Sequence, residues 1–405
     1  MADLIITVGK KKQWEISFPM LGLTIVYLFF TIMDLTSSAQ TGNKNSDRTI
    51  VHIALICLTV YLLAYIILHV RRVPKSRVLC VLFLMAVWIF LTSMLNGAAL
   101  WTLLVQMNMS VLWVLSYLFF WFYTGDKIEN GKRIQKFCGL LTILYLGATV
   151  YYSATTLQQY GHFVAMNVVY YSLAILPWFF ADIDNRESSI RWIIATATVM
   201  ISLKRGAIIA LPVMYICEMF EKGKQNQNGK KIAKLLLMGT LFVAAFFVAD
   251  QVTDGFMSNR FSKEGLEGGS GRIGFYMMAI NAMKQRNAFQ LLIGGGAGSS
   301  VALIGTGVHN EWLEMLFSYG LIGLMLYTAL IVSFITTTVR IYKTVPKYGP
   351  CCLMSLGLYL ILSMVSTGYG GYSGIFLFGF WGYIESLENR RLKEEHEKDW
   401  HTYAF

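Results

Sequence analysis

Residues 50–70 read IVHIALICLTVYLLAYIILHV, and this stretch decides the class of fold. It contains no Asp, Glu, Lys or Arg over its whole length. An α-helix of about 20 apolar residues spans the ~30 Å hydrocarbon core of a bilayer. The apolar residues follow one another and do not alternate with polar ones, as they would in the strands of a membrane barrel. The stretch therefore predicts a transmembrane helix.

Other stretches of the same character follow along the chain, and the composition agrees with them. Of the 405 residues, 56% are hydrophobic and only 14% are charged, whereas a soluble domain carries roughly 25% charged residues. The sequence thus predicts an all-α polytopic membrane protein with about 12 transmembrane helices in a single domain over residues 1–405. The predicted helices cover residues 17–36, 50–70, 78–95, 99–123, 137–153, 163–181, 192–203, 206–220, 235–249, 313–339, 351–368 and 374–387.

The basic residues indicate how these helices are oriented. If the amino terminus is cytoplasmic, about 25 of the 34 Lys and Arg residues fall in cytoplasmic segments, as the positive-inside rule requires. Both termini are then cytoplasmic, and residues 388–405 form a cytoplasmic tail. The first apolar run is longer than the core of a signal peptide, so we expect it to be retained. The net charge of +11 reflects these loops, and we expect no nucleic-acid partner.

The stretch 192–220 allows two interpretations, because Lys204 and Arg205 lie near its middle. One long helix would bury both cations in hydrocarbon, at about 2.5 to 3.5 kcal/mol each on insertion scales. It would also reverse the orientation of everything that follows. Two short helices that meet at an outward Lys204–Arg205 corner avoid both problems, and we prefer them.

The longest polar segment covers residues 250–312 between the ninth and tenth predicted helices, and we expect it to be extracytoplasmic and to carry part of an active site. After Arg272, apolar residues recur at helical spacing and predict an amphipathic helix on the membrane or on the bundle. They are Ile273, Tyr276, Met277, Ile280 and Met283. The glycine-rich turn 294–298 either approaches phosphate closely or only reverses the chain, and it is not a P-loop because no Gly-Lys-Ser/Thr follows.

His309 is the candidate catalytic residue. An imidazole has an ordinary pKa of about 6.5 and can accept a proton at working pH. In this sequence it precedes a predicted helix at the outer membrane surface, beside the carboxylate of Glu311. The alternative is an interfacial histidine that hydrogen-bonds a neighbouring loop. Asn310 and Glu311 are further candidates for substrate contact.

Two arginines on the same predicted side, Arg205 and Arg272, are candidates for binding phosphate, because a guanidinium grips phosphate oxygens in pairs. Alternatively, Arg205 extends to lipid headgroups and Arg272 is a solvated charge at a helix start. Lys204 and Arg260 are weaker candidates, since pairing with lipid or with Glu264 and Glu267 is an equal alternative for them.

The sequence gives no support to a metal site or a bound cofactor. The six cysteines lie in or beside apolar runs and form no CxxC pattern. Asp182-Ile183-Asp184 spells the D-x-D of nucleotide-sugar transferases, but it lies in a predicted cytoplasmic loop without the soluble domain that such sites need. Asp34 and Glu218 fall inside predicted helices, so each should face the bundle or an interface.

Several motifs together resemble the superfamily of Wzy-type O-antigen polymerases and O-antigen ligases. They are Lys204-Arg205-Gly206-Ala207, Gly271-Arg272, Leu292-Ile293-Gly294-Gly295-Gly296-Ala297-Gly298, His309-Asn310-Glu311-Trp312-Leu313 and Tyr319-Gly320-Leu321-Ile322-Gly323. The resemblance covers about residues 190–340, and Lys204 stands where the family often has Ser. It implies a GT-C-like, metal-independent and inverting glycosyltransferase of the bacterial plasma membrane. Its donor and acceptor would be undecaprenyl-pyrophosphate-linked glycans. It also implies that Arg205 and Arg272 hold the pyrophosphate while His309 activates the acceptor hydroxyl.

The preferred function is therefore polymerisation of lipid-linked oligosaccharide repeat units into O-antigen, capsule or exopolysaccharide. A ligase that transfers finished polymer to lipid A core uses the same chemistry and is the first alternative. A 12-helix transporter of lipid-linked sugars is less consistent, because polar residues gather in one outer loop and not at the midplane of two related halves. A structural membrane protein is the last alternative. A partner that sets chain length is implied by the resemblance alone.

Overall fold

The computed structural model describes residues 4–8, 12–36, 49–70, 72–126, 129–161, 163–181, 185–219, 228–262, 272–366 and 369–403. Within these ranges it confirms an all-α polytopic membrane protein, with eight helices long and apolar enough to cross a bilayer. They are α1 (Phe18–Thr36), α2 (Thr49–His69), α3 (Arg77–Leu95), α4 (Leu100–Asp126), α5 (Glu129–Tyr160), α9 (Asn228–Val252), α15 (Glu311–Thr344) and α16 (Gly349–Val365), the last preceded by the 3-10 turn η3 (Pro346–Tyr348).

The other four predicted spans are also helices, but they are shorter or only partly apolar. They are α6 (Val169–Phe180), α7 (Asn185–Ser202), α8 (Arg205–Met219) and α17 (Gly374–Tyr403). With 12 residues, α6 is about 18 Å long, which is less than the ~30 Å of a hydrocarbon core. All of its residues up to Phe179 are buried, so α6 lies inside the bundle. α17 continues without a break from its apolar half through the predicted tail.

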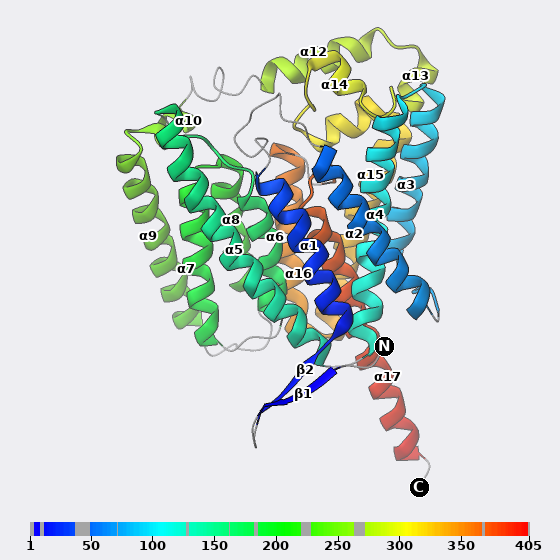
Figure 1. Cartoon of the computed structure of the whole chain (residues 1–405), viewed down its shortest axis with the longest axis vertical. Coiled ribbons are helices and arrows are strands. Elements are labelled where there is room, and N and C mark those ends of the chain that lie inside the picture. The colour runs from blue at the N-terminus through cyan, green and yellow to red at the C-terminus, as the bar shows by residue number, and fades with distance from the viewer. Residues whose placement is uncertain are drawn as a thin grey trace.

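The two ends of the bundle differ, as Figure 1 shows. The amino terminus and the charged half of α17 lie at one end, which we call the termini end. The opposite loop end carries the short helices between α9 and α15, namely α10 (Phe256–Phe261), α12 (Arg272–Lys284), α13 (Ala288–Ile293) and α14 (Ser299–Ile304). The segment predicted as a large outer loop is thus largely helical where it is described.

A small antiparallel hairpin at the termini end was not predicted. Its strands are β1 (Leu4–Val8) and β2 (Lys12–Ile16), with Leu4 opposite Ile16. The β-branched residues of β1 favour a strand. Two strands of this length are not independently stable in water. Their sequence pattern is short and weak compared with the long apolar runs, so it did not lead to a prediction.

Aromatic side chains fill the centre of the bundle, where α4, α6, α15, α16 and α17 meet. Trp113, Trp178 and Trp381 are almost fully buried. The Trp113 indole N–H donates to the Tyr369 carbonyl at 2.9 Å, and that of Trp178 donates to the Phe376 carbonyl at 3.2 Å. Buried indoles need such partners because an unpaired N–H is costly in an apolar core.

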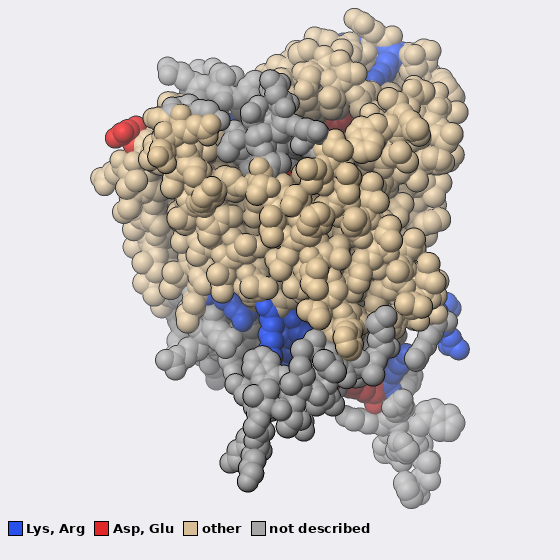
Figure 2. Space-filling view, viewed as in Figure 1, with Lys and Arg blue, Asp and Glu red and all other residues tan. Residues whose placement is uncertain are grey.

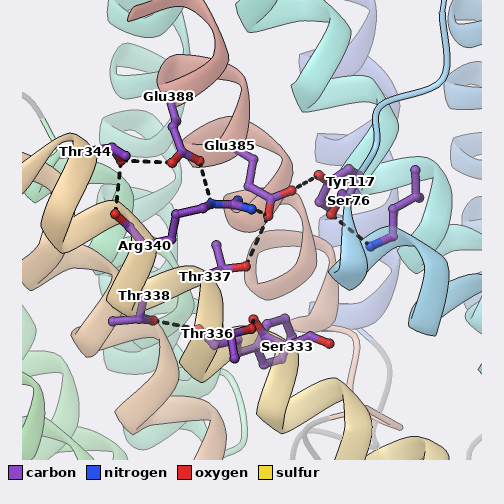
Figure 3. Close-up of polar contacts among 12 residues, drawn as sticks. Ser76, Tyr117, Ser333, Thr336, Thr337, Thr338, Arg340, Thr344, Glu385 and Glu388 are labelled. Carbon is purple, nitrogen blue, oxygen red and sulfur yellow. Dashed lines mark hydrogen bonds and ion pairs between the residues drawn. The ribbon is translucent and has the colours of Figure 1, made fainter. Parts of the chain in front are cut away.

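A polar cluster locks α15 to α17 near the termini end (Figure 3). Arg340 of α15 contacts the buried Glu385 at 2.7 Å and the buried Glu388 at 3.0 Å. Glu385 also accepts hydrogen bonds from Thr337 and from Tyr117 of α4. Because Glu385 and Glu388 are buried while Arg340 is partly exposed, loss of Arg340 would leave two buried carboxylates without a counter-charge, so the cluster stabilises the packing of α15 against α17. The opposite end of the same helix follows directly after His309.

The two acidic residues expected to face the bundle do so. Asp34 is 3% exposed, and its carboxylate accepts a hydrogen bond from the Tyr171 hydroxyl at 2.8 Å. Glu218 accepts one from the Trp192 indole at 2.9 Å. Both predictions are confirmed, because a carboxylate inside an apolar span must find donors from neighbouring helices.

Candidate functional site

The stretch 192–220 forms two helices and not one, as predicted. α7 ends at Ser202 and α8 begins at Arg205, with Leu203 in the left-handed backbone region at φ 54°. Such a conformation is rare for a branched apolar residue and persists only where the surroundings enforce it. The break places Lys204 and Arg205 at the loop end of the bundle instead of in hydrocarbon.

Four cations from distant parts of the chain meet at this corner, and we call Lys204, Arg205, Arg260 and Arg272 the cation cluster. The Arg205 guanidinium donates to the Arg260 carbonyl at 2.7 Å, which joins α8 to α10. Burial, together with the charges of Arg272, Arg260 and Arg205, lowers the pKa of Lys204 to about 7. Burial and the two arginines Arg205 and Arg272 also lower the pKa of Arg260. The contact between Arg205 and Arg260, together with the influence of the Arg272 charge on the pKa values of Lys204 and Arg260, indicates that the four side chains share one site.

His309 lies at the same site. Burial, followed by the charges of Arg272 and Lys204, lowers the pKa of His309 to about 4, so the imidazole is neutral at physiological pH. Its backbone is left-handed at φ 60°. The ring nitrogen Nε2 lies 3.4 Å from the Thr306 hydroxyl, and the ring centroid lies 6.3 Å from that of Phe275. The loop before α15 therefore holds an unprotonated imidazole beside several cations.

The cluster has a large excess of positive charge. No ion pair joins Lys204, Arg260 or Arg272 to a carboxylate in the described part of the chain. Glu264 and Glu267, the partners considered for Arg260 and Lys204, lie outside the described residues. Gathering cations at a half-buried site costs free energy unless an anion completes it. The site is thus suited to an anionic ligand with several oxygen acceptors.

Tyr170 of α6 contributes a hydroxyl that sequence reasoning missed. This hydroxyl is buried and has no hydrogen-bond partner among the described residues. Lys204 Nζ lies 5.8 Å from the Tyr170 ring, and a Cβ at Gly206 would stand 2.5 Å from the hydroxyl oxygen. Gly206 thus leaves room for a tyrosine at the base of the cluster. Because α6 is apolar on nearly every side, its sequence did not indicate that Tyr170 would lie at the cation cluster.

The two residues that follow His309 both hydrogen-bond other parts of the protein. Asn310 caps α15 by accepting from the Leu313 amide at 3.0 Å, and its amide donates to the Met364 carbonyl at 3.4 Å. The Glu311 carboxylate is 1% exposed and accepts from the backbone amides of Tyr369 and Gly370 at 2.8 and 3.3 Å. Both side chains thus support the backbone around His309, and the expected substrate contact of Asn310 and Glu311 stays a prediction.

The glycine-rich turn is a packing element. The amides of Gly295 and Gly296 donate to the carbonyls of Phe317 and Ser318 at 3.2 and 2.7 Å. Those carbonyls lie just before Gly320, where φ is 69° and α15 is kinked. A Cβ at Gly294 would collide with the backbone of Gly320 and Ser318. Of the two interpretations of this turn, the contacts favour chain reversal and close backbone packing over phosphate binding.

Glu314 ties the same region to α14. Its carboxylate accepts from the hydroxyls of Ser300 and Ser318, both at 2.7 Å, and from the Val308 amide at 3.0 Å. Together with Glu311 it orders the chain on both sides of His309. A buried or half-buried carboxylate that accepts several donors is a rigid support for a neighbouring catalytic group.

The amphipathic helix predicted after Arg272 is α12, and it packs on the bundle with one face. Ala279 is fully buried with Val308 and Phe317, and Tyr276 and Met283 pack against them. Ile273 and Met277 point outward and are about half exposed. Because Arg272 is the first residue of α12 and Phe275 lies one turn later, the packing of this helix places both beside His309.

The described residues contain no group of three or more His, Cys, Asp or Glu side chains that could hold a metal ion. Asp182 and Asp184 of the D-x-D sequence lie outside the described residues.

Residues 190–328 match the model of a family described as O-antigen ligase. The matched segment begins in α7 and ends within α15, so it contains the whole cation cluster and His309. No curated protein matches the chain. The similarity therefore covers the cation cluster and His309 but not Tyr170, which lies in α6 before the matched residues.

Proposed function

We propose that this protein is a membrane glycosyltransferase that polymerises undecaprenyl-pyrophosphate-linked oligosaccharide repeat units into O-antigen, capsule or exopolysaccharide. The observation that carries the proposal is the convergence of the cation cluster on a half-buried, neutral His309. The family match supports a membrane enzyme acting on lipid-linked polysaccharide. We further propose that the loop end faces the periplasm or cell exterior of a bacterial plasma membrane, since basic residues predominate in the segments at the other end.

The proposed reaction needs two catalytic functions from the protein: stabilisation of the charge on the leaving group and removal of one proton. An acceptor hydroxyl attacks the anomeric carbon of the donor, the bond from that carbon to the phosphate oxygen breaks, and the electron pair leaves with the lipid pyrophosphate. The cation cluster neutralises the charge that develops on phosphate. His309 accepts the hydroxyl proton, and attack opposite the leaving group inverts the anomeric centre. Neither catalytic function requires a nucleotide.

The same site suits an O-antigen ligase, and the description of the matched family favours that second candidate. The two are separated by the acceptor. The purified protein should convert lipid-linked repeat units into a ladder of longer lipid-linked products without any other acceptor. A ligase would leave the repeat units unchanged until lipid A core is added, and an absence of product under both conditions would refute both candidates. A partner protein that regulates chain length remains a prediction. Addition of a candidate partner to the ladder assay tests it, because a regulator should change the distribution of product lengths.

Donor binding should depend on pH through Lys204. The pKa of free Lys204 is about 7, and only its protonated form attracts phosphate. A bound anion raises that pKa, so the dissociation constant should be flat below pH 7. Above pH 7 it should rise by up to about tenfold per unit until the bound-state pKa is reached. Titration calorimetry with a lipid pyrophosphate between pH 6 and 9 measures this.

The matched variants for this prediction are Lys204→Arg and Lys204→Gln. Arginine stays charged throughout the range, so its affinity should not change with pH. Glutamine should bind weakly at every pH. If wild type and Lys204→Arg give the same slope, Lys204 does not contact the donor.

Replacement of Tyr170 by Phe should raise the KM for donor by about tenfold or more, the loss typical of a hydrogen bond to a charged group. Because the hydroxyl has no partner in the described protein, the variant should melt at or above the wild-type temperature. Steady-state kinetics and thermal unfolding of the same preparation measure both quantities. Tyr359→Phe is the control, since its buried hydroxyl also lacks a partner but lies in α16. A lower melting temperature with unchanged KM would show a purely structural role.

A further inference from the structure

A second basic site lies at the termini end, away from the cation cluster. A cavity of about 690 Å³ opens between α5 and α7, and Phe179 of α6 also lines it. Among the described residues that line it, Lys132, Lys136 and Arg191 are charged and none is acidic. Figure 2 shows basic side chains gathered below the uncharged band, over the lower ends of α5 and α7.

The polar and apolar lining residues are arranged in order of depth. α5 and α7 both run from the termini end toward the loop end, so Lys132 and Arg191 lie at the mouth, while Ile143 and Ile194 lie deeper. From Lys132 to Ile143 the helix rises about 17 Å. That distance is close to one leaflet, about half of a ~30 Å hydrocarbon core. The cavity thus has the vertical pattern of a phospholipid, with charge at headgroup depth and an apolar wall beneath it.

Three cationic side chains at the mouth are arranged for an anion. The Arg191 guanidinium lies 4.2 Å from the centre of the Phe179 ring and donates to the Phe179 carbonyl at 3.3 Å, which holds it at the rim. Lys132 and Lys136 stand one turn apart on the same face of α5, where like charges repel each other. An anionic group between the three cations removes that repulsion.

Gln135 provides an independent indication of a ligand. Its side-chain amide nitrogen is buried against the cavity, and it has no hydrogen-bond acceptor among the described residues. An amide nitrogen that is shielded from water and has no acceptor costs free energy. A rotation of the Gln135 side chain toward the cavity mouth would let phosphate or glycerol oxygens accept its hydrogen bonds.

We infer that the cavity between α5 and α7 binds one anionic glycerophospholipid from the leaflet on the termini side. Basic pockets between transmembrane helices on the cytoplasmic side recognise such headgroups. The acyl chains lie along Gly139, Ile143 and Ile194, and the phosphate contacts Lys132, Lys136 and Arg191. This site is separate from the proposed glycosyl transfer and does not depend on it.

The test compares lipids retained by the full-length protein in native mass spectrometry. After addition of phosphatidylglycerol or phosphatidylcholine at equal concentration, the wild type should retain phosphatidylglycerol preferentially. At about fivefold for each cation at a membrane surface, Lys132→Gln with Lys136→Gln should weaken retention by roughly 25-fold. The control is Arg72→Gln with Lys75→Gln, which removes the same charge from exposed residues of the α2–α3 loop at the same end.

A second variant separates shape from charge. A Cβ at Gly139 would meet only Phe179, at 3.9 Å, so Gly139→Trp has room to fill the cavity and keeps all three cations. It should lose the bound lipid. Phosphatidylglycerol should raise the melting temperature of the wild type and leave that of Gly139→Trp unchanged. Equal retention of both lipids by wild type, or equal retention by the lysine variant and its control, would overturn the inference.

Discussion

Replacement of His309 by Asn should lower the rate of glycosyl transfer by about 10²- to 10⁴-fold, the range for removal of a general base. Asn is the informative substitution because His309 has φ 60°, and Asn tolerates that left-handed conformation better than most residues. The variant thus keeps the backbone of the loop and removes only the proton acceptor. Conversion of lipid-linked repeat units, followed by gel electrophoresis of the products, measures the rate.

The pH dependence of the same reaction tests the environment of His309. In the protein without substrate, the pKa of the His309 imidazole is about 4, because burial and the nearby cations disfavour its protonated form. The value of kcat/KM for wild type should therefore not fall from loss of this base until the pH drops to about 4. A donor pyrophosphate neutralises the neighbouring cations, so the bound-state pKa should be higher and the imidazole a stronger base during the reaction.

His52→Asn is the control for the His309 variant. His52 lies near the start of α2 at the loop end, and its ring faces Trp101 with centroids 6.0 Å apart. Its removal should leave the transfer rate unchanged. A His309→Asn protein with wild-type stability and wild-type rate would show that the imidazole takes no part in the chemistry.

The second large effect is expected at Arg272. Its replacement by Ala should lower kcat/KM by about 10- to 100-fold, since a charge-assisted hydrogen bond contributes about 1.5 to 3 kcal/mol. Arg272 is a favourable choice because its side chain makes no hydrogen bond or ion pair with the described residues, so the loss should be in substrate binding and not in folding. Steady-state kinetics with varied donor concentration measures the change.

Arg272→Lys and Lys284→Ala complete this experiment. Lysine keeps the charge but cannot grip two oxygens in a plane, so it should recover only part of the activity. Lys284 lies at the other end of α12 and is exposed, so its removal tests the loss of a charge from the same helix without a change in the cluster. Equal kinetics for Arg272→Ala and Lys284→Ala would remove Arg272 from the site.

The membrane architecture was predictable because each span is specified locally. A peptide group in hydrocarbon must be satisfied within its own segment, so every long apolar run becomes a helix whatever its neighbours are. The same reasoning located the corner at Lys204 and Arg205, since two cations cannot remain inside a span at little cost. It also required Asp34 and Glu218 to face other helices, where Tyr171 and Trp192 supply their donors.

The roles of individual residues in the loop were less predictable. Glu311 looked like a substrate contact because it follows His309, yet its carboxylate holds the backbone at Tyr369, in the turn between α16 and α17. Hydrogen-bond partners that lie far apart in the chain leave no mark in local sequence. For the same reason nothing in the composition of α6 indicated that the Tyr170 hydroxyl would lie under the cations.

The sequence by itself determined which segments enter the membrane, where the chain must turn, and which residue types can bind phosphate or accept a proton. These properties depend on each segment and its solvent alone. Only the tertiary structure decided that Lys204, Arg260, Arg272 and His309 share one site, where burial and the neighbouring cations lower the pKa values of Lys204, Arg260 and His309. That outcome depends on how α8, α10, α12 and α15 pack, and packing is a property of complementary surfaces that no single segment contains.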